Sequence, residues 1–155
     1  MTRLLPPNWH ETYLSRPWAA VPQPPQSYTC GELMRAVHRD FFGIDTPPIP
    51  VADASDLKAC IKAMCPERYG LRRLAPGVPP REMDVAFFVK ARLRDHCGIA
   101  VQTADGIWVL HCQQQAGVIL SPLAELRSHF YRVLWYRHHG LDAAVARRAK
   151  GESRG

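Results

Sequence analysis

The sequence predicts an α+β domain, with N-terminal helices packed on a small antiparallel β-sheet. Apolar residues recur at helical spacing between Cys30 and Phe42. From Val85 onward, short β-branched and aromatic runs are separated by turn residues. The 155 residues suit one domain with a hydrophobic core. We place this domain at residues 1–137, and we expect residues 138–155 to be a basic tail without a core face.

Composition, charge and cysteine count limit the partners and the cellular compartment that the sequence suggests. The formal net charge of +6 suits an acidic partner, but the arginines are scattered and do not alternate with aromatic residues, so no nucleic acid is expected. No segment reaches the ~18 continuous apolar residues of a membrane span. The chain has five cysteines, and its first seven residues lack the apolar core of a signal peptide. We therefore expect folding in a cytoplasm and free thiols rather than a disulfide framework.

The segment from Cys30 to Phe42 is the clearest predicted helix. Thr29 and Glu32 have the spacing of a capping box, and Gly43 is suited to end the helix. Cys30 is then the first helical residue, where free backbone N–H groups and the helix dipole favour a thiolate. Two interpretations are open: Cys30 is a catalytic nucleophile, or it is a small apolar residue that packs inward with the rest of the helix.

The segments around this helix are less regular. A short helix is expected from Trp9 to about Ser15, and Pro17–Gln26, with four prolines, is expected to be an extended loop. A further helix is predicted from about Ser55 to Met64, with Leu57 facing inward. Residues 69–80 are expected to form a loop.

Five strands are predicted in the second half of the chain, at Val85–Val89, Cys97–Val101, Ile107–His111, Gly117–Leu120 and Tyr131–Tyr136. The second and third are joined by a turn that contains an Asp-Gly pair, a strong hairpin signal. Between the last two strands, Ser121 and Pro122 suit the N-cap and first position of a short helix through Leu126.

His96 and His111 flank the predicted hairpin. Strand side chains alternate between faces, so an even loop of two or four residues would place both histidines on one face, together with Gly98 and Ala100. These two small residues would leave room for the end of a helix to approach. An odd loop would put the histidines on opposite faces.

Cys30, His96 and His111 together would give a nucleophile, a base and a group that orients the base. Each histidine can also be a satisfied residue of the sheet. A further alternative is a zinc site made by the same three residues with water in the fourth position. Cys97 and Cys112 face away from the histidines and no CxxC pair is present, so we expect no metal and no cofactor.

Four segments follow one another in a specific order. They are Tyr28-Thr29-Cys30-Gly31, Met83-Asp84-Val85-Ala86-Phe87-Phe88, His96-Cys97-Gly98-Ile99 and Val109-Leu110-His111. In this order they resemble the NlpC/P60 family of papain-like cysteine peptidases, whose corresponding motifs include "GDxxFF" and "HVGI". Trp9 to Trp18 and Phe42 to Pro47 resemble the subgroup found in the tail assembly proteins of tailed phages.

This resemblance implies a papain-like fold and a cysteine endopeptidase that cleaves amide bonds in peptidoglycan stem peptides. It implies Cys30 as nucleophile, His96 as general base and acid, and His111 as the residue that orients His96. It also implies substrate contacts from Trp18, Tyr28, Thr29 and Gly31. The chain would be made in the host cytoplasm, join other tail-tip or hub proteins in the virion, and act at the bacterial cell wall.

The sequence departs from this family at positions that read the substrate. Thr29 stands where the family has an aspartate that holds the free amine of the peptide, and Trp18 stands where it has a tyrosine. The glycines that usually follow are replaced by Val21-Pro22-Gln23-Pro24-Pro25. Either the substrate differs, or the domain is a structural subunit of the tail tip with weak or no catalytic activity.

Overall fold

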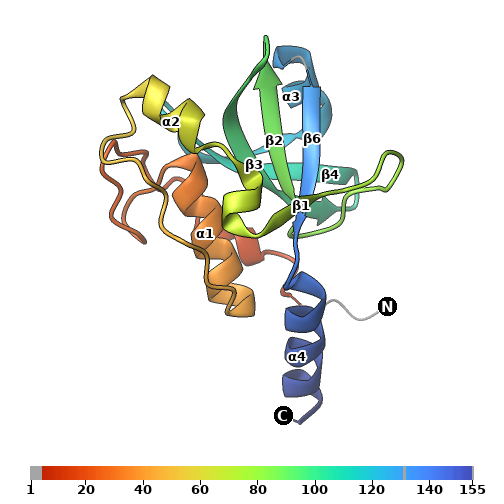
Figure 1. Cartoon of the computed structure of the whole chain (residues 1–155). Helices are drawn as coiled ribbons and strands as arrows, with labels where there is room; N and C mark the ends of the chain where they lie inside the picture. The colour runs from red at the N-terminus through yellow and green to blue at the C-terminus, as the bar shows by residue number, and fades with distance from the viewer. Residues whose placement is uncertain (1–4, 131, 155) are drawn as a thin grey trace.

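The computed structural model describes residues 5–130 and 132–154, which form a six-stranded antiparallel sheet and four α-helices (Figure 1). The strand order is β1-β6-β2-β3-β4-β5. The strands are β1 (Leu71–Arg73), β2 (Val85–Lys90), β3 (Leu93–Thr103), β4 (Gly106–Gln113), β5 (Gly117–Pro122) and β6 (Arg132–His138). The helices are α1 (Cys30–Phe42), α2 (Leu57–Ala63), α3 (Leu123–His129) and α4 (Leu141–Arg154), with 3-10 turns at Trp9–Thr12 and Pro66–Tyr69. The predicted α+β class is confirmed.

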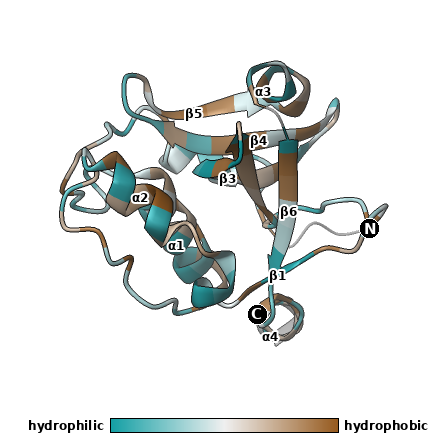
Figure 2. Ribbon diagram, turned by 45° about the horizontal axis from the view of Figure 1, so that its top comes forward, coloured by the Kyte–Doolittle hydropathy of each residue, from teal (hydrophilic) through white to brown (hydrophobic). Residues whose placement is uncertain are grey.

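Helices lie on both faces of the sheet. In Figure 2, α1 and α2 lie on one side of the strands and α3 lies on the other. The α1 side holds the larger core, in which Leu33, Met34 and Val37 of α1 are buried against the sheet. The α3 side holds a smaller cluster of buried residues, formed by Ala86, Phe88, Val109 and Leu126.

Local sequence signals set both ends of α1. The Thr29 Oγ1 accepts a hydrogen bond from the Glu32 backbone N–H at 3.2 Å, so Thr29 is the N-cap as predicted. Gly43 ends the helix with a φ of 63°, a left-handed conformation that glycine adopts without strain. The position of Cys30 as the first helical residue is confirmed.

The loop of the hairpin of β3 and β4 is even, which is the case that places both histidines on one face. Thr103 pairs with Gly106, which leaves a two-residue turn of Ala104 and Asp105. The two strands therefore share the side-chain parity that brings His96 and His111 to one face. This placement is confirmed by a distance of 2.8 Å between His96 Nε2 and His111 Nδ1.

Several predicted boundaries were wrong. Within the segment predicted to be a loop at residues 69–80, β1 pairs with β6. Leu57 is 63% exposed because α2 begins at this residue, on the solvent side of the helix. The last strand was predicted from Tyr131, which lies outside the described residues. The segment after it, expected to lack a core face, forms α4, whose Leu141 and Ala144 are buried.

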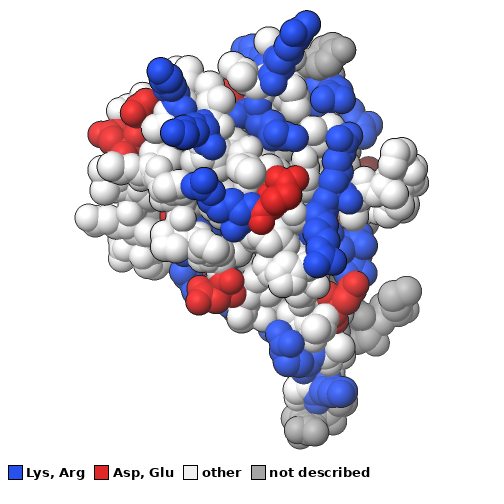
Figure 3. All heavy atoms as spheres, in the orientation of Figure 1, with Lys and Arg blue, Asp and Glu red and all other residues white. Residues whose placement is uncertain are grey.

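The surface carries its positive charge in a dispersed pattern. On the face in Figure 3, lysines and arginines are spread over several elements with acidic residues between them. No helix among the described residues has both the length and the apolar character that a membrane crossing requires.

Candidate active site

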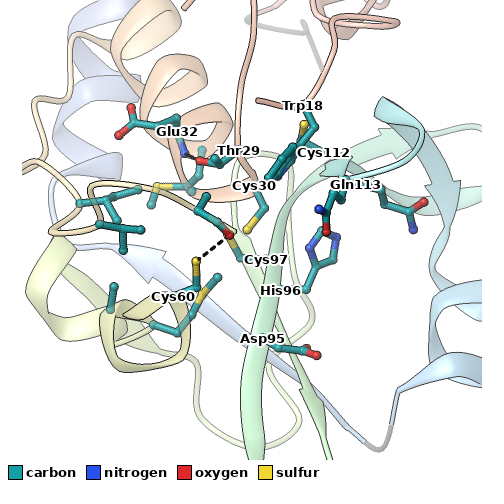
Figure 4. A pocket seen from close by; sticks show the side chains of 18 of the residues that line it. Trp18, Thr29, Cys30, Glu32, Cys60, Asp95, His96, Cys97, Cys112 and Gln113 are labelled. Carbon is teal, nitrogen blue, oxygen red and sulfur yellow. Dashed lines mark hydrogen bonds between the residues drawn. The ribbon is translucent and has the colours of Figure 1, made fainter. Parts of the chain in front are cut away.

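A pocket of about 370 Å³ lies where the N-terminal end of α1 meets β3 and β4 (Figure 4). Cavities of this size are typical of sites for small molecules or short peptides. Its wall includes the predicted site residues Trp18, Thr29, Gly31 and His96. Four of the five cysteines also line it, namely Cys30, Cys60, Cys97 and Cys112.

Cys30 is partly buried and its sulfur faces two partners on β3, Cys97 and His96 (Figure 4). A hydrogen bond from the Cys97 thiol, followed by the nearby His96 ring, holds the pKa of Cys30 well below the usual value for a thiol. Burial and the neighbouring Cys30 raise the pKa of Cys97, with the hydrogen bond to Cys30 as the largest cause. The two shifts together favour a thiolate at Cys30 and a protonated thiol at Cys97.

The position of His96 depends on an irregularity in β3. Phe88 pairs with His96, but the next residue of β2 pairs with Arg94, so Asp95 is left over as a bulge. A bulge bends a strand and redirects its side chains, and bulges are common beside active sites. The His96 ring is held by stacking on Phe130, with centroids 6.2 Å apart and planes 11° apart.

His111 connects His96 to Ser121 in a chain of hydrogen bonds. His96 Nε2 lies 2.8 Å from His111 Nδ1, and His111 Nε2 lies 2.8 Å from the Ser121 Oγ. Burial, with a smaller effect of the nearby His96 ring, lowers the pKa of His111 to about 3, so His111 is neutral at ordinary pH. A neutral ring can accept a hydrogen bond from His96 at one nitrogen while the N–H of the other nitrogen donates to Ser121.

The role of Ser121 corrects one prediction. The Ser-Pro pair suggested that Ser121 would cap the following helix, but β5 continues through Pro122, and α3 has no side-chain cap. Ser121 is instead directed to His111. The physical reason is the ladder between β4 and β5, in which Val109 pairs with Ser121.

The path by which Cys30 reaches His96 also differs from the prediction. Gly98 and Ala100 were expected to leave room for a helix end on the histidine face. A Cβ on Gly98 would lie 2.4 Å from Val109 Cγ1 and 3.0 Å from His111 Cβ, so β4 side chains fill that space. Since α1 buries an apolar stripe, it packs on the opposite, more apolar face, and Cys30 reaches the histidine beside Cys97.

Three of the four predicted substrate contacts lie in the pocket wall. Trp18, Thr29 and Gly31 line it, and a Cβ at Gly31 would lie 2.5 Å from Ile49 Cδ1, so a larger residue there would displace that side chain. Tyr28 is different, because its side chain is only 2% exposed and packs in the core. Its contribution to the site is therefore structural.

The other pocket thiols bind the backbone. Cys60 donates to the Ala54 carbonyl at 3.3 Å, and Cys112 donates to the Tyr28 carbonyl at 3.5 Å. Among residues 5–130 and 132–154, no group of three or more His, Cys, Asp or Glu side chains is arranged to hold a metal ion. The geometry therefore gives no support to the zinc alternative.

Comparisons with known proteins give little further information. No protein-family model matches the chain, and no curated protein matches it. One matching solved structure is an N-acetylmuramoyl-L-alanine amidase from Bacteroides uniformis, at 17% sequence identity and a TM-score of 0.34. The match covers 43% of this chain and 32% of the amidase. A TM-score this low does not establish a shared fold, so the function of the site must be argued from its geometry.

Proposed function

We propose that this chain is a cysteine hydrolase that cleaves an amide bond in peptidoglycan stem peptides as part of a phage tail. The observation that carries the hydrolase is that Cys30 interacts with His96 and His96 with His111, with a thiol of lowered pKa at one end and a neutral buried histidine at the other. The substrate and the phage tail rest on the resemblance of the surrounding segments to the NlpC/P60 family. The chain would be made in the host cytoplasm and would act at the cell wall together with other tail proteins.

The geometry gives each residue a step in amide hydrolysis. The Cys30 thiolate attacks the carbonyl carbon, and the backbone N–H of Cys30, at the helix start, is a suitable donor to the oxyanion. Protonated His96 then gives its proton to the leaving amine, which breaks the C–N bond. Neutral His96 next takes a proton from water, the resulting hydroxide attacks the thioester, and the Cys30 thiolate leaves.

His111 and Ser121 support the charged form of His96. Protonated His96 carries N–H groups on both nitrogens, so its Nε2–H donates to His111 Nδ1. The proton of neutral His111 must then reside on Nε2, from which it donates to the Ser121 Oγ. Ser121 thus fixes the tautomer that His111 needs in order to accept from His96.

A second candidate is a structural tail-tip subunit that retains the fold without efficient catalysis. The observation in its favour is that Thr29, which carries no charge, directly precedes the nucleophile. The Thr29 hydroxyl caps α1, and Glu32, the acidic pocket residue nearest in sequence, is paired with Arg35 at 2.9 Å.

Digestion of purified peptidoglycan distinguishes the two candidates. We expect the wild-type chain to release soluble fragments whose new amino and carboxyl ends identify the cleaved bond. Treatment with iodoacetamide at pH 7 should abolish release, whereas a metal chelator should leave release unchanged. Because the pKa of Cys30 is lowered while burial raises the pKa of Cys112 to about 12, mass spectrometry should find Cys30 alkylated long before Cys112. A reactive Cys30 without any release of fragments would favour the structural subunit.

The Ser121→Ala variant tests the hydrogen-bond chain. Removing the hydroxyl leaves the buried Nε2–H of His111 without an acceptor, at a cost of about 1–3 kcal/mol. We expect kcat/KM and the alkylation rate of Cys30 at pH 7 both to fall about tenfold. Ser121→Thr keeps the hydroxyl and should restore both rates. A lower Tm with unchanged rates would show that Ser121 serves only stability.

A further inference from the structure

Cys97 is a pocket thiol that takes no covalent step in the proposed hydrolysis. It lies on β3 directly after His96, is 1% exposed, and faces α1 rather than the histidines. Figure 4 shows it beside Cys30 in the pocket. The thiols of Cys60 and Cys112 donate to backbone carbonyls, whereas the Cys97 side chain is the largest cause of the lowered pKa of Cys30. This thiol is therefore directed at the reactive atom of the site.

Two neighbouring thiols that line one pocket (Figure 4), one with its pKa lowered and the other with its pKa raised, are arranged as an attacking and a resolving thiol. The thiolate of a partly exposed cysteine is the form that peroxide oxidises. The nearby protonated thiol can then displace oxygen from the resulting sulfenic acid. Cys97 needs no contact with solvent for this second step, because Cys30 meets the oxidant in the pocket.

We propose that Cys30 and Cys97 form a reversible disulfide when the protein meets hydrogen peroxide, and that this disulfide protects Cys30 from irreversible oxidation. The Cys30 sulfur attacks a peroxide oxygen, the O–O bond breaks, and the hydroxide that leaves becomes water after taking a proton. The Cys97 sulfur then attacks the Cys30 sulfur, the S–O bond breaks, and a second water leaves with the Cys97 proton. The two thiols lose two electrons, which reduce the peroxide. The disulfide stands on the geometry of the pair, and its effect on activity rests on the proposed hydrolase.

The test begins with the wild-type chain. After treatment with hydrogen peroxide, peptide mapping should find Cys30 linked to Cys97, with a mass loss of two hydrogen atoms that dithiothreitol reverses. A link from Cys30 to any other cysteine, or sulfinic acid at Cys30 without a link, would overturn the proposal. This measurement needs no substrate, so it stands even where peptidoglycan is not cleaved.

Variants then separate Cys97 from the other thiols. Cys97→Val and, as a smaller replacement, Cys97→Ala are treated with peroxide until Cys30 no longer reacts with iodoacetamide, and dithiothreitol is then added. In the wild type, most of the Cys30 reactivity and of the untreated hydrolysis rate should return. In both variants, less than about a tenth should return, because Cys30 proceeds to sulfinic acid. Cys112→Ala, which removes another buried pocket thiol, should recover like the wild type. Equal recovery by the wild type and both Cys97 variants would contradict the proposal.

Discussion

Replacing Cys30 with alanine is expected to lower the rate of peptidoglycan cleavage by at least about 10⁴-fold, because the variant has no nucleophile to form the thioester. The fold should be retained, since alanine suits the first turn of a helix and the Thr29 cap remains. Cys30→Ser should be nearly as inactive, because a serine hydroxyl is not ionised by the contacts that ionise the thiol. The measurement is the release of soluble fragments per unit time at matched protein concentration.

Two further variants make this result specific. Cys65→Ala removes an exposed thiol that is outside the pocket wall, and it should cleave at the wild-type rate. His96→Ala alone should lower the rate by about 10³-fold or more, and adding it to Cys30→Ala should lower the rate no further, since groups that act as a unit are not additive. Cleavage by Cys30→Ala within tenfold of the wild type would refute the assignment of the nucleophile.

The features predicted correctly from the sequence are those fixed by neighbouring residues. Thr29 and Gly43 act on backbone groups only a few residues away, so the ends of α1 could be assigned without any knowledge of the sheet. The Asp-Gly signal for a hairpin is equally local and was correct, whereas the even length of the turn, which brings the two histidines to one face, was only one of two cases considered.

The position of the nucleophile required long-range information. Alternation along a regular strand places His96 and Cys97 on opposite faces, which is correct, but it does not show which face α1 covers. The bulge at Asp95 depends on the register with β2, and nothing in the residues around it signals a bulge. Cys30 interacts with Cys97 on the face that α1 covers and also with His96, an arrangement that strand alternation does not predict.

Ser121 and α4 show two other limits of local reasoning. A serine before a proline is typical of a helix start, and the competing pairing with β4 extends the strand by two residues beyond the predicted end at Leu120. In α4, the apolar side chains that pack on the core are Leu141, Ala144 and Val145, near its start, so they form no long apolar stripe in the sequence. For Ser121, a predicted strand that continued to Pro122 would have placed its side chain on the same face as Val109, which is also the face of His111.

The ion pair of Asp84 and Arg137 is expected to carry the largest stability effect away from the pocket. Asp84 is fully buried, and its two oxygens accept from Arg137 Nε and Nη2, each at 2.8 Å. The Arg137 side chain is 23% exposed. Arg137→Met therefore leaves a buried carboxylate without a counter-charge, and it should lower the free energy of unfolding by about 3–5 kcal/mol.

Removing the other partner of the ion pair should lower the free energy of unfolding by a smaller amount. Asp84→Asn leaves Arg137 unpaired, but that side chain already reaches solvent, so we expect a loss of roughly 1–3 kcal/mol. Urea unfolding of both single variants and the double variant gives the coupling energy, and the double variant should be more stable than the sum of the single losses implies.

Arg72→Met, at the exposed neighbour paired with Arg137 across β1 and β6, is the matched control and should change stability little. Two results would contradict this prediction: losses of stability that simply add in the double variant, or a larger loss for Asp84→Asn than for Arg137→Met. Asp84 directly precedes β2, and Phe88 of this strand packs on the His96 ring. The less stable variants should therefore also cleave peptidoglycan more slowly near their unfolding midpoints.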